Sequence, residues 1–226
     1  MSKIRKALAS VATLAVATGI CGATTVAASA ATPACGPGCL EVFSPRFGTA
    51  DNPRFVETVL HGTARVGAPM VLSRASNTNT ASDIIPHLKT VSGFYASGMV
   101  SAAVNQHYGS LYAAQLEYAP SGHATGLCVG LAHPAYENES LSLQSCTVAG
   151  STVFIVDSPD APAATPSYTP LVIGSTANFV HPWTMVYYGN PTDRPTPRIR
   201  VSRLERTRSG AVPIDQLFGT AHGILK

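Results

Sequence analysis

The stretch GLCVGLAHPAYENESLSLQSCTVAGSTVFIVD, residues 126–157, contains the densest alternation of apolar and polar residues in the chain. Cys128 and Cys146 lie 18 positions apart within it. Alternation over four to eight residues is typical of a strand with one buried face. The stretch therefore predicts consecutive strands, with the two cysteines at the ends of a hairpin-like segment.

The N-terminus has the three parts of a secretory signal peptide. MSKIRK supplies positive charge, an uncharged apolar run follows, and Ala28-Ser29-Ala30 provides the small residues that signal peptidase requires. A membrane anchor is the alternative, but the apolar run is shorter than the ~20 residues of a spanning helix. We therefore predict export, cleavage after Ala30, and a secreted domain of residues 31–226 without a membrane segment.

Cleavage would also balance the charge of the chain. The sequence has 15 Lys and Arg against 12 Asp and Glu, and the predicted leader removes three basic residues and no acid. A balanced charge argues against a protein that binds polyanions over its whole surface, so we expect no specific nucleic-acid partner. The exception is a basic stretch with one acid, Glu205, and six arginines: Arg194, Arg198, Arg200, Arg203, Arg206 and Arg208. It indicates either a site for phosphate, sulfated glycan or nucleic acid, or a strand with a solvated basic face.

The exported chain would keep four cysteines, Cys35, Cys39, Cys128 and Cys146. An even number of cysteines in an oxidising compartment predicts disulfides, for which three pairings are possible. We favour Cys35–Cys39, because CGPGC contains the Gly and Pro of a sharp turn, and Cys128–Cys146, because they end a hairpin-like segment. No second C-x-x-C or spaced histidine pair accompanies them, so we expect no metal site.

Short apolar and β-branched runs, separated by clusters of Gly, Pro, Asn and Ser, continue along the chain. They predict strands at 40–43, 54–60, 70–74, 99–104, 112–119, 127–132, 141–146, 152–157, 170–174, 184–188 and 199–204. No long segment has the 3.6-residue period of a helix. The exported length of about 196 residues suits one core, so we predict a single all-β domain.

Three features of the opening stretch follow one another at fixed spacing. Gly-Leu-Cys-Val begins at Gly126, Leu-x-Leu-x-x-Cys occupies 141–146, and an apolar strand with an aromatic residue follows. This order resembles one repeat of the ricin-type β-trefoil family, in which the two cysteines bridge within a repeat. A Gln-x-Trp element closes each repeat of that family, and here Thr152 and Phe154 stand at the Gln and Trp places.

Two other parts of the sequence resemble the repeat less closely. The segment 198–218 keeps Gln-x-aromatic in Gln216-Leu217-Phe218, and CLEV at 39–42 with the segment 70–85 offers an opening strand, a turn and an apolar end. The resemblance implies a β-trefoil with enlarged loops and three unequal repeats. We place these repeats at about 39–98, 99–174 and 175–226. A generic β-sandwich with one disulfide hairpin is the alternative.

The resemblance also implies glycan binding through a carboxylate and a stacking aromatic ring. In the best-matched repeat, Gly130 stands at the place of the acid and Gln144 at the place of the aromatic residue. We therefore expect this repeat to have no working sugar site, and fold alone does not establish lectin activity.

We therefore predict that the ligand site lies in the C-terminal repeat. Asp215 and Gln216 are predicted to hydrogen-bond sugar hydroxyls, and Trp183 and Tyr187 to supply the stacking face, with Tyr188 beside them. The alternative is that Trp183 and Tyr187 are core residues and that Gln216 braces a turn.

Catalytic signatures are absent from the exported part of the sequence. It contains no G-x-S-x-G, H-E-x-x-H, Walker or G-x-G-x-x-G motif. The closest carboxylate pairs, Glu137 with Glu139 and Asp157 with Asp160, lie in predicted loops, and the seven histidines have no ligand spacing. We favour an exported binding module for a carbohydrate or cell-wall polymer, without a cofactor. A secreted hydrolase or an inhibitor-like interaction protein of another type remains the alternative.

The export prediction has a direct test. Mass spectrometry of protein from the culture medium should find an N-terminus at Ala31, because the small residues before it fit signal peptidase. Recovery of the intact Met1 terminus in the membrane fraction would contradict it.

Overall fold

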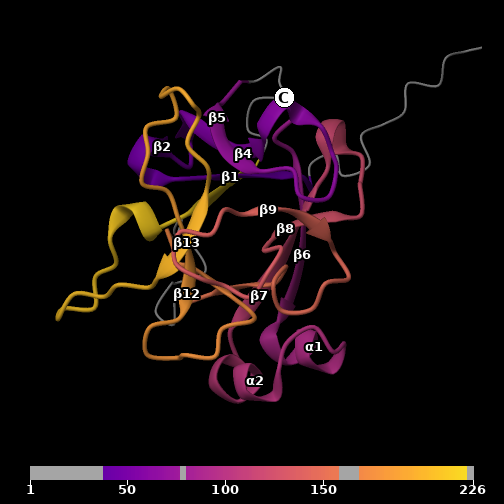
Figure 1. Cartoon of the computed structure of the whole chain (residues 1–226), viewed down its shortest axis with the longest axis vertical. Coiled ribbons are helices and arrows are strands. Elements are labelled where there is room, and N and C mark those ends of the chain that lie inside the picture. Colours follow the sequence, from indigo (N-terminus) through magenta and orange to yellow (C-terminus); the bar gives the residue numbers. More distant parts are fainter. Residues whose placement is uncertain (1–37, 77–79, 158–167, 223–226) are drawn as a thin grey trace, which may run out of the picture. The chain divides into compact units, whose positions relative to one another are not determined.

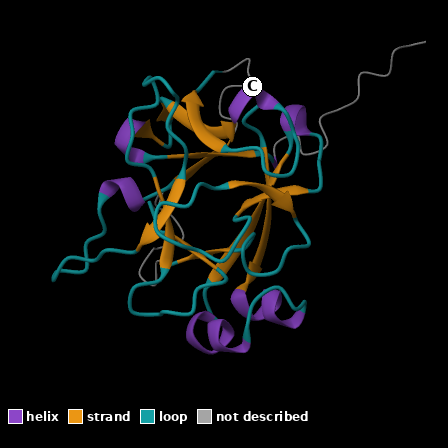
Figure 2. Ribbon diagram, viewed as in Figure 1, coloured by secondary structure: helices purple, strands orange, loops and turns teal. Residues whose placement is uncertain are grey.

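The computed structural model describes residues 38–76, 80–157 and 168–222, all within the unit Thr32–Lys226. The leader and Cys35 lie outside the described residues, so what was predicted for them stays a prediction. The described chain is mostly β-structure (Figure 1). Figure 2 shows strands that curl around a centre, with short helices at the periphery.

Twelve strands form one curled antiparallel sheet. They are β1 Leu40–Phe43, β4 Phe55–Val59, β5 Met70–Arg74, β6 Ile84–Thr90, β7 Tyr112–Tyr118, β8 Leu127–Gly130, β9 Ser142–Ser145, β10 Phe154–Val156, β11 Leu171–Ile173, β12 Trp183–Val186, β13 Arg200–Arg203 and β14 Gly219–His222. A separate small hairpin consists of β2 Gly48–Thr49 and β3 Asn52–Pro53. The helices are α1 Val91–Ala96 and α2 Ala102–Tyr108, with short 3-10 turns η2 Pro45–Phe47, η3 Leu60–Gly62, η4 Pro120–Gly122 and η5 Ile214–Gln216.

The strand pairing repeats three times. In each group of four successive strands, the first pairs with the second and the second with the third: β1-β4-β5, β7-β8-β9 and β11-β12-β13. The first also meets the fourth, in Leu40↔Ile84, Ala114↔Phe154 and the isolated bridge Thr169↔Phe218. The groups are therefore β1-β4-β5-β6, β7-β8-β9-β10 and β11-β12-β13-β14.

The fourth strand of each group pairs with the first strand of the next. These pairs are β6–β7, β10–β11 and β14–β1, and they close six strands into a ring. The three remaining hairpins meet one another through the bridges Pro69↔Ser142, Val71↔Arg198 and Ser140↔Arg200. A six-stranded ring with three hairpins on one end is the β-trefoil architecture. The predicted fold class is confirmed, and the β-sandwich alternative is wrong.

Residues in equivalent positions of the three groups form layers of one core. Ile84, Phe154 and Phe218 make the equivalent first-to-fourth contacts and are all buried. Thr152 and Gln216 precede two of them by two residues, as the Gln-x-Trp resemblance implied. The closing element of the repeat therefore persists as a buried apolar residue in each group.

The disulfide Cys128–Cys146 is confirmed, with a sequence separation of 18 and a Cα–Cα distance of 4.8 Å. It joins β8 to the end of β9 and so closes the hairpin of the second group. Closing a loop of this size stabilises the fold by roughly 3 kcal/mol in the chain-entropy account. Cys39 is also disulfide-bonded, and its predicted partner Cys35 lies outside the described residues.

The segment 99–104 was predicted as a strand, and this is wrong because the region forms α2. The hydroxyl of Ser101 accepts from the Val104 amide at 3.2 Å and caps the helix, while Val104 and Tyr108 bury one face. α1 and α2 pack beside β6 and β7 (Figure 1) and share a second core with Val153, Ile155 and Val172. Within the described residues, no helix has both the length and the apolarity needed to cross a membrane.

Two strands of the main sheet were not predicted, and neither were the two-residue strands β2 and β3. β6 contains Pro86 and ends in four exposed residues, so it lacks alternation, but it pairs with β7 over its whole length. β14 is a short run of small and polar residues that forms by pairing with β1. The grouping also differs from the repeat boundary placed near residue 174, because β11 pairs with β12 and opens the third group.

One layer of the core contains a fully buried carboxylate, Glu57. Val56, Cys128 and Thr184 make the equivalent first-to-second contacts, so the next residues, Glu57, Val129 and Met185, are equivalent too. All three are fully buried.

Val129 and Met185 suit the apolar layer, whereas both carboxyl oxygens of Glu57 lack a hydrogen-bond partner among the described residues. Burial raises the pKa of Glu57 from 4.5 to about 8. The carboxyl is therefore neutral in the folded chain near neutral pH.

This position predicts a stability that depends on pH. Because the folded pKa lies above the unfolded one, the free energy of unfolding should fall as pH rises from about 4.5 to about 8, by roughly 5 kcal/mol in total. Glu57→Met should abolish this fall and should stabilise the fold most at pH 9. Urea unfolding at pH 5, 7 and 9 measures it.

Glu57→Gln is the matched control, since it removes the titration and keeps a buried polar group. It should flatten the pH dependence while remaining less stable than Glu57→Met. Parallel pH profiles for the wild type and both variants would contradict a buried, unpaired carboxyl.

Candidate functional site

Two of the residues predicted to bind a ligand, Gln216 and Tyr187, make contacts that stabilise the fold. Gln216 is buried, donates to the Ser202 hydroxyl at 2.8 Å and the Arg203 carbonyl at 2.7 Å, and accepts from the Glu205 amide at 2.9 Å. Tyr187 is fully buried in the main core, and burial raises its pKa to about 12. The structure therefore gives Gln216 a bracing role and Tyr187 a packing role.

The other two predicted residues are partly exposed. The Arg203 guanidinium stacks over the Trp183 ring, 3.7 Å from its centroid, and donates to the His181 carbonyl at 2.9 Å. Asp215 lies in η5, and its backbone carbonyl accepts from the Tyr187 amide at 2.9 Å. One face of the Trp183 ring is thus occupied by Arg203. Ligand binding by these residues stays a prediction.

In the second group, the place of the lectin acid has no room for a side chain. A Cβ on Gly130 would lie 2.7 Å from the Ser151 carbonyl oxygen and 2.9 Å from Cγ2 of Thr152. Gln144 is buried and donates to the Ser142 hydroxyl at 2.8 Å. Close packing therefore fills the region where the resemblance implied a sugar site.

The first group keeps an aromatic residue and an arginine at corresponding places. Phe55 pairs with Arg74, as Trp183 pairs with Arg203, and each arginine lies over its partner's ring. The second group has Leu127 paired with Ser145 instead.

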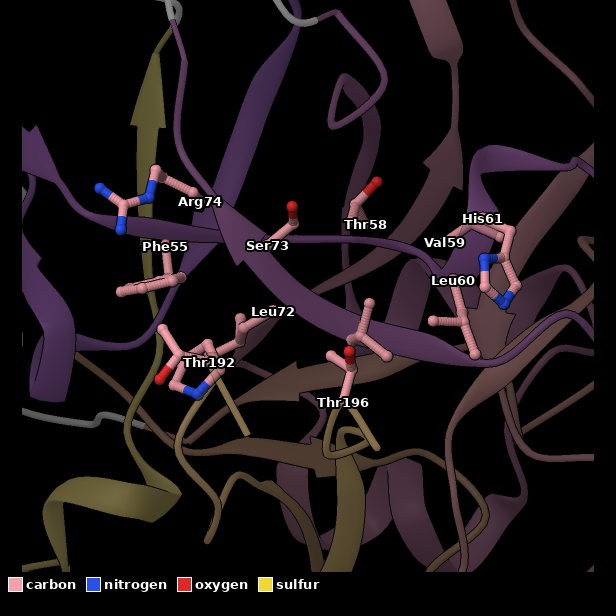
Figure 3. A pocket seen from close by; sticks show the side chains of 12 residues that line it. Phe55, Thr58, Val59, Leu60, His61, Leu72, Ser73, Arg74, Thr192 and Thr196 are labelled. Atoms are coloured by element: carbon pink, nitrogen blue, oxygen red, sulfur yellow. The ribbon is translucent and has the colours of Figure 1, made fainter. Parts of the chain in front are cut away.

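A pocket of about 330 Å³ lies at the Phe55–Arg74 pair (Figure 3). Its walls come from the β4–β5 hairpin and from the loop after β12. In Figure 3, Phe55 and Thr192 lie toward one end, His61 lies at the other, and Thr196 lies between them. The ring of Phe55 is half-buried, and Thr192 and Thr196 contribute hydroxyls.

A second pocket of about 700 Å³ shares Leu60, His61 and Thr196 with the first. Its other lining residues are Arg194, Pro195, Pro197, Arg198 and Arg200. We call these two adjoining pockets the Arg groove.

Local structure holds the groove in shape. The Asn190 side chain accepts from the amide and the hydroxyl of Thr192 at 3.1 and 3.0 Å, which fixes the start of the loop. The backbone of Arg198 forms an isolated antiparallel β-bridge with Val71 of β5. The Ile199 amide donates to the Met70 carbonyl at 2.9 Å.

On the opposite wall, His61 adopts a left-handed backbone conformation, with φ 63°, and turns the chain at the end of β4. Such conformations are uncommon outside glycine and place a side chain where a regular strand would not.

The charge of the groove has one sign. Arg74, Arg194, Arg198 and Arg200 are exposed, and no acid is among the described lining residues. The two ion pairs within the described ranges, His87–Glu117 and Arg206–Asp157, do not involve these arginines. Arg200 donates to the Asn138 carbonyl at 3.3 Å, which orients its guanidinium. The groove is therefore positively charged, and no acid among its described lining residues balances that charge.

The sequence did not identify the groove as a site, although it identified the arginines. Arg198 and Arg200 are exposed and alternate with the fully buried Ile199 and Val201, as a strand with a basic face requires, although Ser202 is buried as well. The opposite wall comes from the first repeat, more than a hundred residues earlier. Only the contact between the first and third hairpins brings these walls together.

Other reactive groups are scattered. His87 Nε2 lies 2.6 Å from Oε2 of Glu117, whose Oε1 accepts from the Gly126 amide at 2.6 Å, but neither residue lines the Arg groove. Burial raises the pKa of Glu139. Within residues 38–76, 80–157 and 168–222, no three His, Cys, Asp or Glu side chains lie close enough to hold a metal ion.

Comparison with solved structures finds proteins of similar fold. A designed 3-fold symmetric protein, ThreeFoil, aligns with a TM-score of 0.48 at 8% sequence identity, over 81% of this chain and 98% of that chain. No family model and no curated protein matches the sequence. The fold assignment rests on the threefold strand pairing described above.

The lack of space at Gly130 can be tested by adding one methyl group. Gly130→Ala should lower the free energy of unfolding by about 1–3 kcal/mol, because its Cβ meets a backbone carbonyl that cannot move freely. Thermal or urea unfolding measures the change. Gly38→Ala is the control, since a Cβ there meets nothing within 4 Å. Equal stability of the two variants would show that the region around Gly130 has room for a side chain.

Proposed function

We propose that this chain is an exported binding module for a carbohydrate of the cell envelope, and that the Arg groove is its binding site. Support comes from the groove's lining. It combines a half-buried aromatic ring, Phe55, with the hydroxyls of Thr192 and Thr196 and the imidazole of His61. Sugar rings present apolar C–H faces and many hydroxyls, so they suit one amphipathic wall of this kind.

The position of the groove in the fold also supports the proposal. It lies at the aromatic–arginine pair of the first group, and the second group has neither member of that pair. Export rests on the signal-peptide pattern, and kinship to ricin-type lectins rests on the sequence resemblance. The proposed binding region therefore lies at the junction of the first and third hairpins.

Two substitutions test the site. Phe55→Leu keeps an apolar side chain but removes the flat ring, and Thr196→Val keeps the shape but removes the hydroxyl. Each should weaken carbohydrate binding about threefold to tenfold, the loss expected for one stacking contact or one hydrogen bond. A glycan array and co-sedimentation with isolated cell walls identify the bound carbohydrate, and calorimetry then measures its affinity.

Thr220→Val is the control, since Thr220 is exposed on β14 and lines neither pocket. It should bind like the wild type. The proposal would be wrong if the folded wild-type protein bound no glycan on the array and did not co-sediment with cell walls. Unchanged affinity in both groove variants would also contradict it.

A further inference from the structure

We infer that the carbohydrate bound in the Arg groove is an anionic polysaccharide, whose charged groups lie against a row of arginines at 194–200. This inference rests on the proposed function and adds the chemical class of the ligand. It starts from the charge of the groove. Four arginines line it, no acid is among the described lining residues, and none of the four takes part in an ion pair within the described residues.

Unpaired arginines at this density repel one another when the groove is empty. A chain with a balanced exported charge has enough acids to pair them, and it does pair Arg206 with Asp157 at 2.9 Å. Asp193 is the nearest acid in sequence, and it does not line either pocket. An anionic ligand would supply the missing counter-charge, and guanidinium groups bind sulfate, phosphate and carboxylate through paired hydrogen bonds.

The backbone sets the spacing of the row. Arg198 and Arg200 are exposed on the same side of an extended segment, with the fully buried Ile199 between them. Alternate residues of a strand are about 6.5–7 Å apart. A linear polymer with repeated charges can therefore contact both residues at once.

The neighbouring pocket favours a sugar chain over other polyanions. Phe55, Thr192 and Thr196 offer one ring and two hydroxyls beside the arginine row. The two pockets together exceed the room that one sugar unit needs. One unit would occupy the Phe55 pocket while its neighbours place their acidic groups at Arg198 and Arg200.

Three polysaccharides with one backbone separate charge from sugar recognition: dextran, carboxymethyl dextran and dextran sulfate. Binding to the full exported chain is measured by calorimetry at several salt concentrations. Charged dextran should bind at least tenfold more tightly than dextran at low salt, and its affinity should fall steeply as salt rises. The carboxymethyl and sulfate forms distinguish a carboxylate from a sulfate ester as the source of charge.

Arg198→Gln and Arg200→Gln should each weaken binding to charged dextran and lower the slope of log affinity against log salt by about one. Arg208→Gln is the matched control, because Arg208 belongs to the same basic stretch, is exposed and lines neither pocket. It should leave both affinity and slope unchanged. An equal loss in all three variants would overturn the assignment of the row to the groove.

The outcomes separate this inference from the proposed function. If neutral and charged dextrans bind equally and the arginine variants change nothing, the anionic class is wrong while carbohydrate binding stands. If no polysaccharide on the array or in this series binds, both fail. A single-stranded oligonucleotide that binds more tightly than dextran sulfate, with the same arginine dependence, would overturn the carbohydrate class.

Discussion

The fourth strand of each group pairs with the first strand of the next, and this pairing organises the whole fold. It closes six strands into a ring through β6–β7, β10–β11 and β14–β1. A closed ring leaves no unpaired barrel edge and fixes the register of the three hairpins that lie against it. Once β1 meets β14, the first and third groups become neighbours. The Arg groove lies between parts of these two groups.

The threefold register also shows where the chain departs from its own pattern. One such departure is a carboxylate in the first hairpin, at the place that Val129 and Met185 occupy in the other two groups. Glu57 replaces an apolar residue beneath strand neighbours that line the groove, namely Phe55 and Val59 on the same strand and Leu72 across from it. Burying an unpaired carboxyl costs stability that an apolar side chain would not. Such departures from local rules are expected where function competes with stability.

Sequence patterns predicted most of the strands because alternation and turn residues are local signals. The Cys128–Cys146 pairing was predicted because the two cysteines end a hairpin-like segment, and the places of Phe154 and Phe218 came from the resemblance to the ricin-type repeat. β6 was not predicted because Pro86 and a run of exposed residues break its alternation. α2 was mistaken for a strand because the segment that Ser101 caps contains valines and small residues. These two elements depend on partners elsewhere in the chain, which a local pattern does not contain.

The candidate site was less predictable than the fold. The resemblance directed attention to Asp215, Gln216, Trp183 and Tyr187, yet the structure commits Gln216 to hydrogen bonds and Tyr187 to the core. The arginines of the basic stretch were visible in the sequence. Their opposite wall was not, since it depends on the closure of the ring. Long-range pairing thus creates the site from residues that have separate local roles.

We propose that the ligand binds between the first and third hairpins. Two-dimensional NMR of the labelled protein, titrated with short dextran sulfate fragments, tests it most directly. The largest shifts should occur at the backbone amides of Leu60, His61, Thr192, Thr196 and Arg198. Shifts concentrated instead around Trp183 and Asp215, with the groove amides unmoved, would contradict it.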